Sequence, residues 1–163
     1  MKVKDVCTKE PWICPMNGTL ADAARIMWDG DCGAVPVVDA EGKVVGMISD
    51  RDITLAALTK DRPPRSVEVR EVMTGKVHTC SDEDDVRLAL RTMGEQRVRR
   101  LPVVDAAGTI TGILSISDCI RRASPTIEIG EPGIPSDELL AALRALATPW
   151  RKFIARGRAA ISR

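Results

Sequence analysis

The chain has 163 residues, 44% hydrophobic and 29% charged, and this balance predicts a folded core rather than a disordered chain. Its 24 basic and 23 acidic side chains leave a formal net charge of +1, which gives no overall attraction to nucleic acid or to a membrane surface. No stretch approaches the roughly 20 apolar residues of a membrane span, and residues 1–6 lack the apolar run of a secretion signal. We therefore expect a soluble, cytoplasmic protein.

The first predicted elements are a short lead at 3–8, an extended piece at 12–14 and a helix that begins near residue 20. Apolar residues recur in this helix at intervals of three and four positions, which is typical of one buried face. The expected buried stripe consists of Leu20, Ala23, Ala24, Met27 and Trp28.

A hairpin and a second helix complete this first unit. A β-strand at 34–39 turns through Gly42 and returns at 43–49, and the next helix is expected to begin at Ser49. The proline-containing segment 62–66 is predicted to be a linker.

The same series recurs 66 residues later. Residues 3–53 align with 69–119 without a gap, and 16 of the 51 aligned positions are identical, which indicates an internal repeat. Ser81 is expected to cap the first helix of the second copy, and the next helix is expected to begin at Ser115. The buried stripe predicted for that first helix is Val86, Ala89, Leu90 and Met93.

The C-terminal part lies outside the repeat. A Pro/Gly-rich stretch at 124–135 precedes a predicted helix at 136–147 with leucines on one face. Residues 149–163 carry five basic side chains and no acid, with Trp150 and Phe153 on their apolar face. This segment could pack within an oligomer, dock on a partner or lie on an anionic surface.

These elements predict an α+β fold in which two pseudo-symmetric β-α-β-β-α repeats form one compact module with a C-terminal helical extension. Each repeat is too short to bury both helices and its small sheet alone, so the two are expected to pack together. The predicted boundaries are 1–60 and 69–123 for the repeats, 61–68 and 124–135 for the linkers, and 136–163 for the basic extension.

The cysteines do not predict a metal site or a disulfide framework. Their number is odd and none form a C-x-x-C pair, so we expect small, reduced, buried side chains. They are Cys7, Cys14, Cys32, Cys80 and Cys119.

A Ser-x-x-Asp motif stands at the start of the second helix in each copy, as Ser49 with Asp52 and as Ser115 with Asp118. A carboxylate can accept both hydrogen bonds of a ribose diol, and a helix N-terminus attracts a phosphate. The same motif is also a helix-capping box, so a purely structural role stays open. Arginines at 97, 99 and 100 could hold an anion or form a solvated strand edge.

Residues 35–39 with 46–52, and 101–105 with 112–118, resemble the sequence blocks of the CBS (cystathionine β-synthase) repeat family, and the resemblance covers 3–122. It implies two pseudo-twofold-related clefts that bind the adenosine part of AMP, ADP, ATP, NAD or S-adenosylmethionine. In the first cleft, the resemblance places Ser49, Asp52, Thr74, Val77, His78, Arg99, Arg100 and Leu101. In the second cleft, it places Thr8, Pro11, Trp12, Gly33, Ala34, Val35, Ser115 and Asp118.

By similarity to the regulatory gamma subunit of AMP-activated protein kinase, Arg99 and Arg100 would face phosphates. The first cleft is therefore expected to favour more charged ligands, and the second adenosine, AMP or none. His78, the single histidine, aligns with Trp12 and is expected to pack or to touch the adenine.

The sequence predicts a regulatory module rather than an enzyme, because it carries no P-loop, G-x-G-x-x-G or H-E-x-x-H motif. No catalytic cofactor is expected, only an adenine nucleotide as a regulatory ligand. The resemblance implies a homodimer through the repeat helices and an effector protein; nucleic acid and membrane partners are not expected. The alternative is a ligand-free interaction or dimerisation module.

Overall fold

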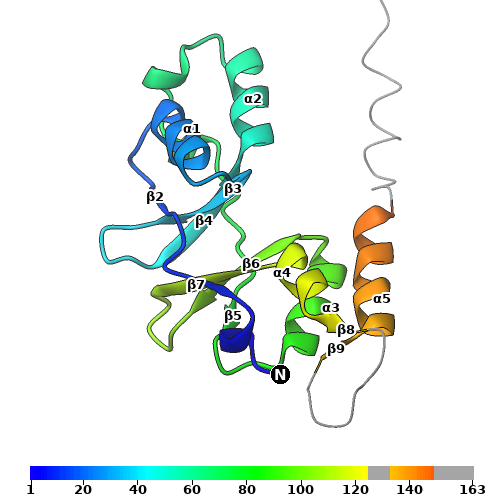
Figure 1. Cartoon of the computed structure of the whole chain (residues 1–163). Helices are drawn as coiled ribbons and strands as arrows, with labels where there is room; N and C mark the ends of the chain where they lie inside the picture. The colour runs from blue at the N-terminus through cyan, green and yellow to red at the C-terminus, as the bar shows by residue number, and fades with distance from the viewer. Residues whose placement is uncertain (125–132, 149–163) are drawn as a thin grey trace, which may run out of the picture.

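A computed structural model describes residues 1–124 and 133–148 of the chain. Figure 1 shows two similar halves, one above the other, each built of a small sheet with two helices on it, and an additional helix against the lower half. The first half comprises the short helix η1 (Val3–Asp5), β1 (Thr8–Lys9), β2 (Cys14–Pro15), α1 (Leu20–Asp29), β3 (Ala34–Val38), β4 (Val44–Ser49) and α2 (Asp50–Thr59). After η2 (Pro64–Ser66), the second half comprises η3 (Val69–Glu71), β5 (Cys80–Ser81), α3 (Val86–Gln96), β6 (Arg100–Val104), β7 (Ile110–Ser115) and α4 (Ile116–Arg121). The final elements are β8 (Ala123–Ser124), β9 (Ile134–Pro135) and α5 (Ser136–Ala147).

The sheets confirm the repeat and its predicted α+β architecture. The antiparallel pair β3–β4 aligns Ala34 with Ser49, and β6–β7 aligns Arg100 with Ser115, which is the same register shifted by 66 residues. Each hairpin turns through a glycine at positive φ, Gly42 at 78° and Gly108 at 83°, a conformation that costs glycine little. An isolated bridge between Lys43 and Thr109, themselves 66 residues apart, lies on the pseudo-twofold axis.

The two leads are exchanged between the halves. Strand β1 pairs with β7 of the second half, Thr8 opposite Ile113, whereas Thr74 forms a bridge with Met47 of the first half. The Val3 side chain is fully buried in the core of the second half. That of Val69 is fully buried in the core of the first half. Each core is therefore completed by the other repeat, as the shortness of a single repeat led us to expect.

The helices that cover the two sheets differ in burial. All four residues of the stripe predicted for α3 are buried, but in α1 only Leu20, Ala23 and Met27 are. The prediction was wrong for Ala24 and Trp28, which are exposed, Trp28 to 85%. Helix α5 packs on α3, and no helix of the described residues covers the matching face of α1.

Two further local predictions need correction. Asp85 rather than Ser81 caps α3, with its carboxylate accepting from the Arg87 N–H at 2.8 Å. The segment predicted as an irregular linker begins and ends in strand, because Ala123 and Ser124 of β8 pair in parallel with Ile134 and Pro135 of β9.

Helix α5 spans 136–147, as predicted, and its apolar side packs against the second half. Leu139 and Ala142 are buried there, and Leu143 and Leu146 are partly buried, but Leu140 is 46% exposed. The basic segment 149–163 lies outside the described residues. Over the described ranges, no helix is both long and apolar enough to cross a membrane.

Candidate functional site

A cleft of about 350 Å³ lies between the two halves, at the N-terminus of α4. The exchanged lead brings Thr8 beside Ile113, two residues before Ser115, and the first half contributes Trp12 and Ala34 to the opposite wall. The complete lining is Thr8, Glu10, Pro11, Trp12, Gly30, Asp31, Cys32, Gly33, Ala34, Arg100, Ile113, Ser115, Ser117 and Asp118. Of the residues predicted for the second cleft, seven of eight are in this lining, while Val35 is buried in the core of the first half.

Ser115 and Asp118 form the capping box of α4. Asp118 Oδ2 accepts from the Ser115 N–H at 2.7 Å and from its hydroxyl at 2.6 Å, and Ser115 Oγ accepts from the Asp118 N–H at 3.1 Å. Asp118 Oδ1 accepts from Arg121 Nη2. Asp118 is only 6% exposed, and both of its carboxylate oxygens already accept hydrogen bonds from the protein at the edge of the cleft.

The first predicted cleft has the same framework. Asp52 Oδ2 accepts from the Ser49 N–H at 3.0 Å and from its hydroxyl at 2.6 Å, and the Met47–Thr74 bridge places Thr74 two residues before Ser49 in the register of β4. Here, however, Asp52 Oδ1 has no hydrogen-bond partner among the described residues. Leu55 stands where Arg121 stands in the other half, and it supplies no cation. Asp52 is thus the more available of the two carboxylates.

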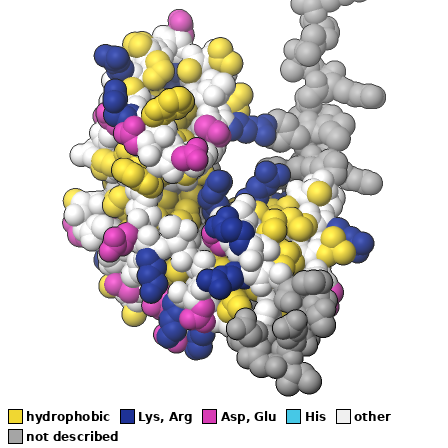
Figure 2. Space-filling model, viewed as in Figure 1, with side chains coloured by type: hydrophobic (Ala, Val, Ile, Leu, Met, Phe, Trp, Pro, Cys, Tyr) yellow, Lys and Arg dark blue, Asp and Glu magenta, His cyan; other side chains and the backbone are white. Residues whose placement is uncertain are grey.

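Arg99 and Arg100, which were predicted for the first cleft, line other hollows of the described structure. The pairing of Arg100 with Ser115 places Arg100 in the lining of the second cleft. Arg99 and Arg100 also line a hollow of about 350 Å³ against Ser117 and the end of α5. At the β6–α4 junction the Ile116 N–H donates to the Arg99 carbonyl at 2.9 Å, as the Asp50 N–H donates to the Gly33 carbonyl at 3.1 Å in the first half. Figure 2 shows Lys and Arg side chains gathered at the notch between the two halves on the face that it presents.

The remaining residues predicted for the first cleft are less clearly gathered. Val77 and His78 are partly exposed in the segment before β5, and Leu101 is fully buried in the core of the second half. Leu101 therefore supports the strand and does not present its side chain to a ligand.

Sequence reasoning missed several lining residues of the second cleft, above all Glu10 and Asp31. Both have positive φ, 51° and 45°, and mark sharp turns after β1 and α1. Non-glycine residues with positive φ are uncommon. No sequence motif marks Glu10 and Asp31, and only a prediction of these two sharp turns could have found them. Gly30 is also part of the lining. The Trp12 indole packs so closely against it that a Cβ at this position would lie 2.6 Å from Cδ1 of the indole.

The thiols are not organised for chemistry. Burial raises the pKa of Cys14 to about 11 and those of Cys80 and Cys119 to about 12, which disfavours the reactive thiolate. Burial also raises the pKa of Cys32 in the second cleft, against the opposing effect of the nearby Arg100. Within 1–124 and 133–148, no group of three or more His, Cys, Asp or Glu residues is placed to hold a metal ion.

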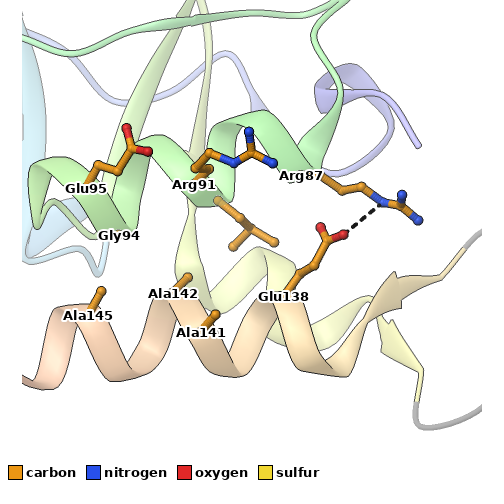
Figure 3. Close-up of a pocket in the computed structure, with 9 residues that line it drawn as sticks. Arg87, Arg91, Gly94, Glu95, Glu138, Ala141, Ala142 and Ala145 are labelled. Atoms are coloured by element: carbon orange, nitrogen blue, oxygen red, sulfur yellow. Dashed lines mark ion pairs between the residues drawn. The ribbon is translucent and has the colours of Figure 1, made fainter.

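A further groove, of about 360 Å³, runs between α3 and α5 (Figure 3). Its floor includes Gly94, Ala142 and Ala145, and the ion pair of Arg87 with Glu138 at 3.6 Å closes one end. All of its lining residues belong to α3 and α5, so the first half contributes nothing to it. We assign this groove to helix packing rather than to the candidate site.

Comparison with known proteins places these features in a family. The CBS domain family model matches residues 3–59 and 69–124, which are the two repeats. A 17.7 kDa protein of Acidianus ambivalens is 32% identical over 138 residues, which cover 85% of this chain and 82% of that protein.

Two solved structures add ligands to the comparison. The CBS domain pair of protein MJ0100, in complex with 5′-methylthioadenosine and S-adenosyl-L-methionine, is 29% identical, with a TM-score of 0.68 over 74% of this chain and 94% of that chain. CBSX2 in complex with AMP is 27% identical, with a TM-score of 0.63 over 74% of this chain and 93% of that chain.

Proposed function

The chain belongs to the CBS-domain family, as a tandem pair, and we propose that it is a regulatory module whose two inter-repeat clefts bind adenosine-containing ligands. The observation that carries the proposal is the second cleft, which neither repeat could form alone, because Thr8 and Trp12 come from one and Ser115 and Asp118 from the other. Pairs with this fold have been solved with 5′-methylthioadenosine, S-adenosyl-L-methionine and AMP.

In this proposal, the Ser and Asp of each capping box contact the sugar and its 5′ substituent. In the described part of the chain nothing donates to Asp52 Oδ1, so this oxygen can accept from a ribose hydroxyl, whereas Asp118 must share or exchange its bond with Arg121. The Arg121 side chain is 69% exposed, so it can move away without losing a buried environment. AMP, ADP, ATP, NAD and S-adenosylmethionine are the ligands to compare.

A bound ligand that touches both repeats would favour one relative arrangement of them, and a partner able to distinguish the arrangements would read the ligand level. We propose a non-enzymatic, cytoplasmic module that reports to an effector protein, as a homodimer through its helices. The exposed apolar side chains Trp28, Leu55 and Leu58 on α1 and α2 support such an association.

Those side chains also favour a second candidate function, a protein-interaction module whose clefts stay empty. In that case the Ser-x-x-Asp motifs serve only as caps, a role that their hydrogen bonds already fulfil.

Ligand-induced thermal stabilisation separates the two candidates. A ligand at about 100 times its dissociation constant should stabilise the fold by roughly 2.7 kcal/mol. We expect such stabilisation from at least one of AMP, ATP, NAD and S-adenosylmethionine, and we expect Asp52→Ala and Asp118→Ala to reduce it.

The matched control is Asp22→Ala. Asp22 forms the same box with Thr19 at the start of α1, away from both clefts, with its Oδ2 accepting from Thr19 Oγ1 at 2.7 Å. This variant should lose the stability of a cap, about 1 kcal/mol, yet keep the full ligand-induced shift. If a millimolar panel of all four ligands leaves the melting temperature of the native chain unchanged, the interaction module is the correct function.

A further inference from the structure

At two matching positions, the two repeats carry side chains of opposite charge. Glu10 and Asp31 line the second cleft, and neither carboxylate has a hydrogen bond or ion pair among the described residues. Shifting by 66 residues replaces Glu10 with Lys76 and Asp31 with Arg97, and Ser117 of the second cleft corresponds to Arg51. The same backbone framework therefore presents acids on one side and bases on the other.

The second cleft also offers an aromatic face. Trp12 is 54% exposed, and the absence of a side chain at Gly30 lets the indole lie against the end of α1. A cation near an indole is attracted by the ring, and the carbonyl end of a helix attracts positive charge as well. Trp12, Glu10, Asp31 and the end of α1 thus all favour a positive group in one place.

Among the described residues that line this cleft, Arg100 is the one cation. Arg100 lines the cleft and makes no ion pair among the described residues. Asp118, the third acid of the lining, is already bonded to Arg121. The described part of the lining therefore offers a ligand two free carboxylates and one free guanidinium.

The lengths of the helices at the two clefts also make the second cleft the poorer site for a phosphate. Helix α2, at the first cleft, has 10 residues, whereas α4, at the second, has only 6. The partial positive charge of a helix N-terminus arises from aligned peptide dipoles, so the short α4 offers a phosphate less than α2 does.

We propose that the second cleft binds a sulfonium nucleoside with an amino-acid tail, of the S-adenosylmethionine type, and that phosphate-bearing adenosine ligands bind at the first cleft. The sulfonium and ammonium groups of such a ligand match the two carboxylates, and its carboxylate matches Arg100. This assignment rests on the proposed function, because it presumes that the clefts bind adenosine.

Calorimetric titration of the full chain with S-adenosylmethionine and S-adenosylhomocysteine tests the assignment, because the second compound lacks the sulfonium charge and is otherwise nearly the same. We expect S-adenosylmethionine to bind at least about tenfold more tightly. The double variant Glu10→Gln/Asp31→Asn should reduce this preference to within about threefold, because it removes the two negative charges that face the sulfonium group. Both replacements keep the size of the side chain at its turn.

Two further variants separate the clefts. Arg100→Gln should weaken both compounds equally, since both carry the tail carboxylate. Lys76→Gln/Arg97→Gln should weaken ATP several-fold and leave S-adenosylmethionine unchanged.

The outcomes distinguish this inference from the function on which it rests. If S-adenosylhomocysteine binds the native chain as tightly as S-adenosylmethionine, or the Glu10/Asp31 double variant keeps the preference, the assignment is overturned although adenosine and ATP still bind. If adenosine, ATP and both sulfur compounds all fail to bind, the proposed function itself falls.

Discussion

Glu71 connects three segments at the junction of the two repeats. Its Oε1 accepts from the Glu68 N–H at 3.0 Å, and its Oε2 accepts from Lys60 Nζ at 3.3 Å and Arg62 Nη1 at 3.0 Å. The hydrogen bond from the Glu68 backbone, followed by those from Lys60 and Arg62, lowers the pKa of Glu71 to about 2. A single surface carboxylate thereby ties the end of α2 to the lead of the second repeat.

Glu71→Gln should therefore lower stability in a pH-dependent way. In the folded chain the pKa of Glu71 lies below its ordinary value of 4.5. The stabilisation that the Glu71 carboxylate provides is therefore present above pH 4.5 and disappears as the pH falls toward 2. Urea denaturation at pH 7, 4.5 and 3 measures this effect: the difference between the midpoints of the native chain and the variant should become smaller as the pH falls.

Glu41→Gln is the control, because the Glu41 carboxylate has no ion pair or hydrogen bond among the described residues. It should leave the midpoint unchanged at every pH. A Glu71→Gln deficit that stays constant from pH 7 to 3 would contradict the role assigned to the charge.

At the scale of elements, α3 and α5 depend on close approach. A Cβ on Gly94 would lie 3.4 Å from Ala145 Cβ and 3.5 Å from Ala142 Cα, so the two helices are nearly in contact at this point. The matching residue of α1 is Trp28, which is 85% exposed. One position of the repeat thus holds the smallest side chain under a covering helix and the largest on an open face.

The effect of a substitution at Gly94 on the free energy of unfolding should change sign with the size of the new side chain. Gly94→Ala fits the space and improves helix propensity, so we expect a gain of up to about 1 kcal/mol. Gly94→Trp would force α5 away and should cost about 1–3 kcal/mol. Chemical denaturation measures both, and Trp28→Ala, on the open face, should stay within about 0.5 kcal/mol. Equal stability of the alanine and tryptophan variants would mean that α5 does not pack on α3 in solution.

This difference also explains what the sequence could and could not predict. Hydrophobic periodicity and the 66-residue repeat predicted the two hairpins, the helix starts at Ser49 and Ser115, and the bounds of α5, because each depends on local pattern. Periodicity could not reveal that α5 covers one helix and leaves Trp28 open, since that depends on tertiary packing. The contribution of Arg100 to the second cleft was not predicted either, because a strand start between two clefts can present its side chain to either.

At the scale of the whole molecule, the exchanged leads make the two repeats interdependent. The Val3 N–H donates to the Asp84 carbonyl at 2.9 Å, and in the other half the Val69 N–H donates to the Gly18 carbonyl at 2.8 Å. Each valine is fully buried in the core of the opposite repeat. We therefore expect the module to unfold as one cooperative unit.

Val3→Ala should cost roughly 2 kcal/mol, from lost apolar burial and a small cavity. Its local effect should appear in the second half: native-state hydrogen exchange should increase in α3 and β6 rather than in α1. Val69→Ala is the matched variant and should increase exchange in α1 and β3. Faster exchange of α1 in the Val3 variant would show that the leads are not exchanged.

The reciprocal leads also determine what a solitary repeat could be. A chain that ended before Val67 would keep its own lead but have no surface on which to place it, and its sheet would lack the residues that complete the core. Two such chains could exchange their leads and complete each other's cores, so a single repeat should be stable only as half of a dimer. The covalent connection at 60–66 then raises the local concentration of one half around the other without contributing the fit between them.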